Sequence, residues 1–202
     1  VLDSTGLKVY GEGEWKVRQH GISKRRTWRK IHLGINPKTG DIEAVELTDN
    51  SIDDASMVQP LLNHVNKKID QIGADGAYDK RKVYEALLKA GIKSILIPPR
   101  KDAHIWYHGN SRGDPHPRDE HVRMIRMMGR KKWKEKSGYH MRSLVETGVY
   151  RYKTIFSDRL SARDIDRQNV EVNLKCKILN KMNTFGMPDS YKVDFRVPEK
   201  KR

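Results

Sequence analysis

The chain has 202 residues, a net charge of +15, an isoelectric point near 9.9 and a single cysteine, Cys176. No stretch approaches the roughly 18 consecutive apolar residues that can span a bilayer, the N-terminus has no signal-peptide pattern, and one cysteine excludes an internal disulfide framework and fits a reducing cytosol. The basic residues are spread over several segments rather than along one amphipathic helix, so the expected polyanionic partner is nucleic acid rather than a membrane.

The first quarter of the chain predicts three strands in a meander. Residues 1–9 are apolar and β-branched enough to form a strand, and residues 28–35 alternate between apolar and polar side chains. The Asn-Pro-Lys-Thr-Gly segment at 36–40 is a strong turn signal, and residues 42–47 form the third expected strand.

Helices and strands are then expected to alternate. A helix is predicted over residues 53–65, capped by Asp53 or Asp54, and a short strand over residues 69–74. Asp79 is expected to cap a second helix, and residues 94–97 read as a fifth strand.

The second half of the chain predicts mainly helices. Residues 100–120 read as a loop, a helical pattern resumes near Glu120, and it pauses around residues 136–138. Two further helices are expected over residues 138–156 and 162–182.

The resulting order, β-β-β-α-β-α-β-α-α, predicts an α/β fold with a mixed five-stranded sheet flanked by helices. This is the layout of the ribonuclease-H-like fold. One domain is expected over residues 1–186, followed by a polar tail at 187–202.

Three acidic residues occupy positions that this fold would bring together. Asp3 lies on the first strand, Asp75 ends the fourth, and Glu146 lies in the helix expected over 138–156. Taken singly, each acid could be a turn, cap or solvated surface residue. Clustered, three carboxylates suit two Mg²⁺ or Mn²⁺ ions about 3.5–4 Å apart, which can activate a nucleophile and stabilise the leaving oxygen of a phosphodiester.

The helix expected over residues 138–156 carries a charged stripe, Tyr139, Arg142, Glu146 and Lys153, in the pattern Y-x₂-R-x₃-E-x₆-K. At about 100° per residue these positions fall within an arc of roughly 60°. A plain solvated face would show the same stripe. On an active-site helix, Glu146 would bind metal, Arg142 and Lys153 would pair with phosphates, and Tyr139 could pack or hydrogen-bond near a nucleotide.

This pattern resembles, at all four positions, the signature of the IS4/IS5-type DDE transposases of bacterial insertion sequences. The nine residues that begin at Asp3 (Asp-Ser-Thr-Gly-Leu-Lys-Val-Tyr-Gly) and the five that begin at Asp75 (Asp-Gly-Ala-Tyr-Asp) are similar to the segments around that family's first and second aspartates. The resemblance runs from residue 1 to at least residue 180. It implies that Asp3, Asp75 and Glu146 bind the metal ions; Asp79 is the rival for the second position but is expected to be a helix cap.

The resemblance also implies a function. A metal-bound water attacks a phosphodiester at the transposon end, and the released 3′-hydroxyl, activated by the two Mg²⁺ or Mn²⁺ ions, attacks target DNA. Since two ends must be joined, a homodimer on DNA is expected. Family members normally carry an N-terminal DNA-binding region, so a chain that begins two residues before Asp3 is expected to be a truncated product or an excised domain.

Basic residues outside the stripe form two further candidate DNA contacts. Lys24, Arg25 and Arg26 lie near the first hairpin, and Lys131 and Lys132 lie just before the signature helix, both with tryptophan interleaved. They could hold phosphates while the aromatic rings stack on unpaired bases. The alternative is solvated charge on a basic protein.

Two other functions stay open: a ribonuclease-H-like nuclease without strand transfer, and a DNA-binding remnant without activity. His104, His108, His116 and His121 raise the possibility of a zinc site, but no cysteine lies near them, so structural zinc is not expected. Cys176 lies in an apolar helix and is expected in the core.

Overall fold

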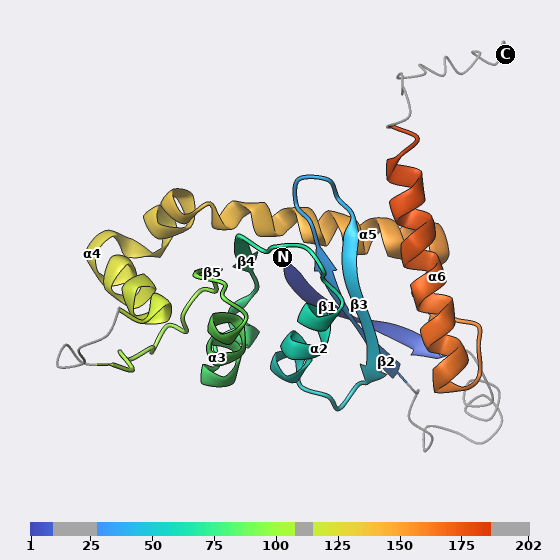
Figure 1. The fold of residues 1–202 in the computed structure, drawn as a ribbon, viewed down its shortest axis with the longest axis horizontal. Helices are drawn as coiled ribbons and strands as arrows, with labels where there is room; N and C mark the ends of the chain where they lie inside the picture. The colour runs from blue at the N-terminus through green and yellow to red at the C-terminus, as the bar shows by residue number, and fades with distance from the viewer. Residues whose placement is uncertain (10–27, 108–114, 187–202) are drawn as a thin grey trace, which may run out of the picture.

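The computed structural model describes residues 1–9, 28–107 and 115–186. These residues form a mixed α/β structure in which helices cover both faces of a central sheet (Figure 1). The predicted α/β class is confirmed, and the arrangement is compatible with a ribonuclease-H-like fold. The expected tail at 187–202 and the basic residues at 24–26 lie outside the described residues.

The central sheet contains the predicted meander. Strands β1 (Leu2–Val9), β2 (Trp28–Ile35) and β3 (Ile42–Asp49) pair antiparallel in sequence order. A two-residue strand that the sequence pattern did not indicate, β6 (Arg159–Leu160), pairs in parallel with the end of β1, which gives the order β3-β2-β1-β6.

Strands β4 (Gln71–Gly73) and β5 (Ser94–Leu96) form a separate parallel pair. The described strands therefore divide into a four-stranded and a two-stranded sheet, whereas the sequence predicted one sheet of five. The two sheets are neighbours, because a Cβ added to Gly73 would lie 3.6 Å from the Val1 side chain at the start of β1.

One face of the central sheet is covered by α5 (Ser143–Phe156) and α6 (Ile165–Asn183), which cross each other in Figure 1. The apolar side chains of β1, β2 and β3 on this face pack against both helices. Cys176 lies in this core as predicted, and its burial raises the thiol pKa to about 12. At Gly148 a Cβ would approach Ile35 Cδ1 to 2.7 Å, so α5 lies very close to β2.

The other face is covered by a 3₁₀ helix, η1 (Asp54–Met57), followed by α2 (Val58–Asn63), and the second core continues through α3 (Arg81–Lys89) to β4 and β5. The prediction that Asp53 or Asp54 caps the first helix is right in position and wrong in the expected side-chain contact. Asp53 occupies the N-cap but makes no side-chain cap bond there, because its carboxylate pairs with Lys80 at 2.6 Å and Lys82 at 2.8 Å.

Asp79 does not occupy the predicted N-cap position of α3. That position is held by Lys80, and the Asp79 carboxylate instead accepts two hydrogen bonds from the Arg118 guanidinium, at 2.6 and 3.2 Å. Both side chains are buried. A bidentate charged partner in the interior holds the carboxylate away from the helix end, which explains the incorrect prediction.

The long helix α4 (Pro117–Ser137) begins three residues before its expected start at Glu120 and is interrupted at Gly129, whose φ of 81° and ψ of 155° are not helical. This backbone conformation is essentially restricted to glycine. The predicted pause at residues 136–138 is confirmed: Gly138 ends α4 in the left-handed conformation, and the 3₁₀ helix η3 (Tyr139–Arg142) leads into α5.

Candidate active site

The first candidate acid, Asp3, lies on the face of the central sheet that α5 covers. Side chains alternate along a strand, so Asp3, Thr5 and Leu7 share one face, and Leu7 packs in the core beneath α5 and α6. The Asp3 side chain is 19% exposed, and its Oδ1 accepts a hydrogen bond from the Ser4 amide at 2.9 Å. Partial burial raises the pKa of this carboxyl group.

The second candidate, Asp75, is presented by the end of the two-stranded sheet. It lies two residues after the end of β4 and caps the 3₁₀ helix η2 (Gly76–Tyr78), where its Oδ1 accepts from the Ala77 amide at 2.8 Å. The negative charges of Asp75 and Glu146 add to burial in raising the pKa of Asp3. The three acids therefore share one electrostatic neighbourhood, although they come from two sheets and a helix.

Arg142 joins two of the three acids. Its Nη2 donates to Glu146 Oε1 at 2.5 Å, and its Nη1 lies 3.9 Å from Asp3 Oδ2. The guanidinium opposes the rise in the pKa of Asp3. A cation thus lies between the carboxylate of β1 and the carboxylate of α5 and offsets their repulsion.

The other two residues of the stripe lie at its ends. Lys153 donates to Thr5 Oγ1 at 2.6 Å, so this helix is joined to β1 by side-chain contacts at two places, Arg142 near Asp3 and Lys153 at Thr5. Tyr139 is half-buried beside the indole of Trp133, with ring centroids 5.6 Å apart. Burial raises the Tyr139 pKa, and the charges of Asp75, Asp3 and Glu146 act in the same direction, which places its hydroxyl in the field of the acids.

The donor set fits a hard divalent cation in its chemistry, because carboxylate oxygens are the ligands that Mg²⁺ and Mn²⁺ prefer. Asp3 and Asp75 each use only Oδ1 for a backbone amide. Within residues 1–9, 28–107 and 115–186, however, no three His, Cys, Asp or Glu side chains are arranged to hold one metal ion. Instead, the side chains of Asp3 and Glu146 lie where both contact the guanidinium of Arg142.

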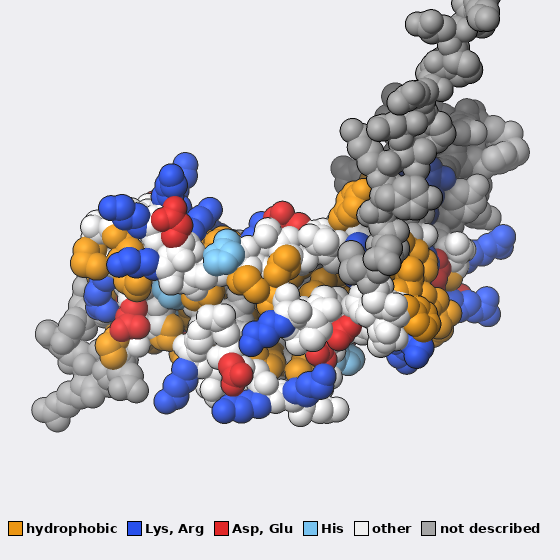
Figure 2. Space-filling view, turned by 90° about the horizontal axis from the view of Figure 1, so that it is seen from above, with side chains coloured by type: hydrophobic (Ala, Val, Ile, Leu, Met, Phe, Trp, Pro, Cys, Tyr) orange, Lys and Arg blue, Asp and Glu red, His pale blue; other side chains and the backbone are white. Residues whose placement is uncertain are grey.

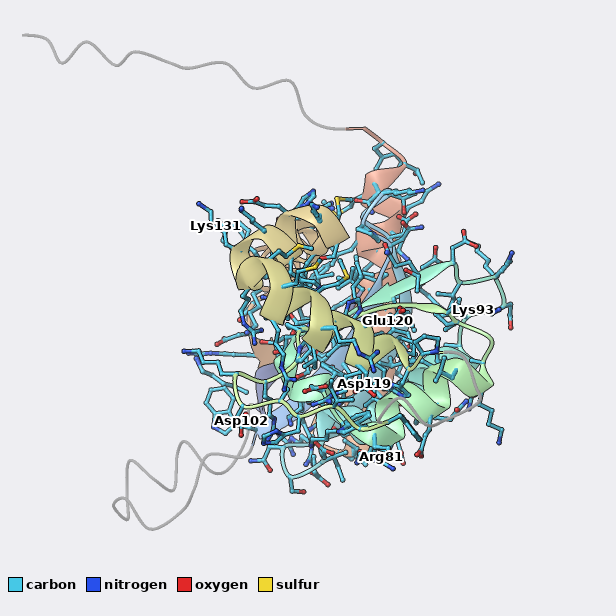
Figure 3. All side chains as sticks on the ribbon, turned by 90° about the vertical axis from the view of Figure 1, so that its left-hand side faces the viewer. Arg81, Lys93, Asp102, Asp119, Glu120 and Lys131 are labelled. Carbon is cyan, nitrogen blue, oxygen red and sulfur yellow. The ribbon has the colours of Figure 1, made fainter. Side chains whose placement is uncertain are left out.

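The basic residues expected to contact DNA have different outcomes. Lys131 and Lys132 are exposed on α4, and Figure 3 shows Lys131 extending outward from that helix. Figure 2 shows Lys and Arg side chains gathered over the end of the molecule where α4 lies. Lys24, Arg25 and Arg26 lie outside the described residues.

Sequence reasoning did not find the polar side chains that support the site from α4. The fully buried Asp119 accepts the backbone amides of Trp106 and Tyr107 at 2.8 and 2.9 Å. His121 bonds to both Trp133 and the Ile95 carbonyl. The spacing of Asp119, His121 and Trp133 follows neither the helical nor the strand period. The only sequence feature that indicates their contacts is Gly129, which lies within an otherwise helical segment.

Two of the histidine rings considered for zinc, those of His116 and His121, form hydrogen bonds with other groups. His116 caps α4 by accepting the Arg118 amide on Nδ1 at 3.3 Å, and His104 supplies a backbone carbonyl to the same arginine at 2.8 Å. His108 lies outside the described residues.

A protein-family model described as "Transposase DDE domain" matches residues 1–181. No solved structure matches the chain. Within the part of the chain that the structure describes, every helix is too short or too polar to cross a membrane.

Proposed function

Since this chain belongs to the Transposase DDE domain family, we propose that it is a transposase of the IS4/IS5 type that cuts DNA at insertion-sequence ends and joins those ends to target DNA. The family as a whole consists of transposition-related enzymes of the polynucleotidyl-transferase kind, which act on DNA and generally use divalent metal ions. The observation that supports the finer proposal is that Arg142 contacts both Asp3 and Glu146, while the charge of Asp75 contributes to the raised pKa of Asp3.

In this proposal Asp3, Asp75 and Glu146 hold two Mg²⁺ or Mn²⁺ ions. When bound, such ions activate the attacking oxygen and stabilise the leaving oxygen of an in-line phosphodiester displacement. Asp3 is suited to this role because its strand, β1, pairs along its length with β2, where Asp3 lies opposite Leu33. The Ser4 and Ala77 amides fix one oxygen of Asp3 and one of Asp75.

The cations of the stripe would bind the DNA backbone. Arg142 has a planar guanidinium, which can bind a phosphate through two parallel hydrogen bonds. It would be free to do so once bound metal ions neutralise the acids in its place. Lys153 lies on α5 beside Thr5 of β1 and would contact the next phosphate, and Tyr139 would pack against a nucleotide. The exposed Lys131 and Lys132 would extend this path along α4.

We further propose that the enzyme works as a homodimer on DNA at the bacterial nucleoid. Exposed apolar side chains on the outer face of α6, among them Val170 at 69% and Leu174 at 57%, support this. An antiparallel pair of α6 helices would place Asp166 in the first turn of one copy near Lys181 in the last turn of the other. Sedimentation of the wild type and of Leu174→Glu tests this: a dimer that dissociates in the variant supports it, and an unchanged state contradicts it.

The catalytic proposal is tested by incubating the protein with end-sequence DNA and Mg²⁺ or Mn²⁺. Wild type should cut the end and join it to a target. Asp3→Asn and Glu146→Gln should bind the DNA but lose more than about 100-fold in cleavage, exceeding the effect of losing a supporting residue. Glu43→Gln is the matched control, since Glu43 is paired with Lys67 on the surface, away from the acids.

The outcomes separate the alternatives. Cleavage without joining would identify a nuclease that lacks strand transfer. Binding without cleavage by the wild type would contradict the proposed activity and leave a DNA-binding remnant.

A further inference from the structure

The two halves of α4 fold back on each other. His121 and Trp133 are 12 positions apart, and in a straight helix they would be separated by about 18 Å along the axis. Because Gly129 breaks the helix, the indole Nε1 of Trp133 lies 3.1 Å from His121 Nδ1. The two rings meet edge to face, with centroids 5.3 Å apart.

The hydrogen bonds of His121 define its protonation state. Its Nε2 lies 2.7 Å from the Ile95 carbonyl oxygen, which can only accept, so Nε2 carries the proton. The indole N–H of Trp133 can only donate, so Nδ1 must be unprotonated. Burial lowers the His121 pKa, which favours this neutral form against the opposing charge of Glu120.

This pair of bonds connects the two sources of the acids. Ile95 lies on β5 and pairs with Ile72 of β4, the strand that ends just before Asp75. At the other end, the fully buried Trp133 contacts Tyr139 at the start of η3, which leads to Arg142 and Glu146. His121 and Trp133 therefore bridge from the strand pair of Asp75 to the segment of Glu146.

Two further contacts hold the rest of α4 on the same strand ends. Arg130, just after the break, donates to the Pro99 carbonyl at 2.7 Å, and Arg118 in the first turn pairs with Asp79, four residues after Asp75. These contacts fix where α4 lies, but His121 and Trp133 are the residues that join its two halves.

We propose that His121 and Trp133 are positioning residues for the candidate active site. They hold Tyr139, and with it the start of the segment that carries Arg142 and Glu146, at a fixed place relative to Asp75. The inference rests on the proposed function in one respect, since the effect to be measured is on metal binding by the three acids.

The test is Mn²⁺ affinity, measured by titration calorimetry at a temperature where circular dichroism shows each variant folded. Trp133→Phe keeps an aromatic ring but removes the N–H, and His121→Phe removes both bonds of the histidine. Each should lower Mn²⁺ affinity by about 10–100-fold, the usual effect of losing a residue that orients metal ligands. His121→Asn keeps an acceptor near the place of Nδ1 and should recover most of the affinity.

A double variant and a control sharpen the result. If the two residues act through one bond, Trp133→Phe combined with His121→Phe should bind Mn²⁺ no more weakly than the weaker single variant. His64→Gln, a change at a half-exposed histidine paired with Glu46, should bind like the wild type. The ¹⁵N-labelled indole resonance of Trp133 should move in His121→Phe and stay near its place in His121→Asn.

Failure of this inference is distinguishable from failure of the proposed function. Wild-type Mn²⁺ affinity in both Trp133→Phe and His121→Phe would overturn the positioning role alone. If the wild type bound no Mn²⁺, or if Glu146→Gln did not abolish the Mn²⁺ binding, the proposed metal site would be refuted. The positioning role would then be refuted with it.

Discussion

The half of the molecule built on β1, β2 and β3 is held mainly by apolar side chains, whereas the half built on β4, β5 and α4 relies on buried polar contacts as well. In the first, leucine, isoleucine and valine from the central sheet pack against α5 and α6. In the second, Asp79 pairs with Arg118, Asp119 receives two backbone amides, and His121 joins Trp133 to β5. The apolar half supplies a rigid platform, and the polar half supplies directional contacts that set positions around Asp75.

The comparison predicts that the polar half is the more sensitive to single changes. Asp79→Ala should lower the free energy of unfolding by about 3–5 kcal/mol, because it leaves the buried Arg118 charge without its partner. Urea denaturation measures this. The control is Glu43→Ala at the surface pair with Lys67, where the loss should stay below about 1 kcal/mol. Equal losses at the two sites would remove the distinction between the halves.

The apolar half should respond to volume rather than to charge. Gly148→Val should destabilise the fold by about 1–3 kcal/mol, because even a Cβ would approach Ile35 Cδ1 to 2.7 Å. Thermal unfolding checks this, and the loss should shrink in an Ile35→Val background, where that methyl group is gone. An unchanged loss in that background would show that the contact with β2 is not the cause.

A hydroxyl in the apolar half offers a smaller change of the opposite sign. Tyr152 is buried, and its oxygen has no hydrogen-bond partner in the part of the chain that the structure describes. Tyr152→Phe should therefore raise the free energy of unfolding by about 1 kcal/mol, since an unsatisfied buried hydroxyl is removed and the ring stays. Chemical denaturation measures the change; a loss of stability would show that the hydroxyl has a partner.

The smallest predicted effect concerns the junction of the two halves and depends on pH. The pKa of Asp3 is raised above its ordinary 3.8 in the folded state, chiefly by burial. Its contribution to stability is therefore fully present below the ordinary pKa and is lost as the pH rises through the raised value. Asp3→Asn should be slightly more stable than wild type at neutral pH, with the gain vanishing near pH 3.8 and below. A gain that persists in acid would contradict this origin.

Sequence periodicity predicted the apolar half well and the polar half only in outline. The meander, α5, α6 and the burial of Cys176 follow from alternation and helical spacing. The two-residue β6 is too short to leave a pattern, and Asp79 was misassigned because a helix cap and a buried ion pair use the same residue type. Tertiary partners such as Arg118, 39 positions away, are invisible to local patterns.

The candidate site shows the same division. The Y-x₂-R-x₃-E-x₆-K stripe predicted a shared face, and the structure indeed brings Arg142 to both Asp3 and Glu146. The catalytic roles of Asp3, Asp75 and Glu146 stay a prediction. The roles of His121 and Trp133 could not be predicted, because their contact depends on the backbone conformation of one glycine.

The parallel pairing of β6 with β1 has a consequence for how the site can deform. The chain leaves α5 and returns at once to β1, where Lys8 bonds Asp158 through both its backbone amide and its side chain, each at 2.7 Å. Asp3 and Glu146 thus lie on two elements, β1 and α5, that are joined both here and by the bond from Lys153 to Thr5. Asp75 arrives from the second sheet, so a movement between the two sheets would change its distances to both Asp3 and Glu146, and the contacts of His121 and Trp133 would oppose that movement. Of the three acids, Asp75 is therefore the one whose position depends on the contact between the two sheets.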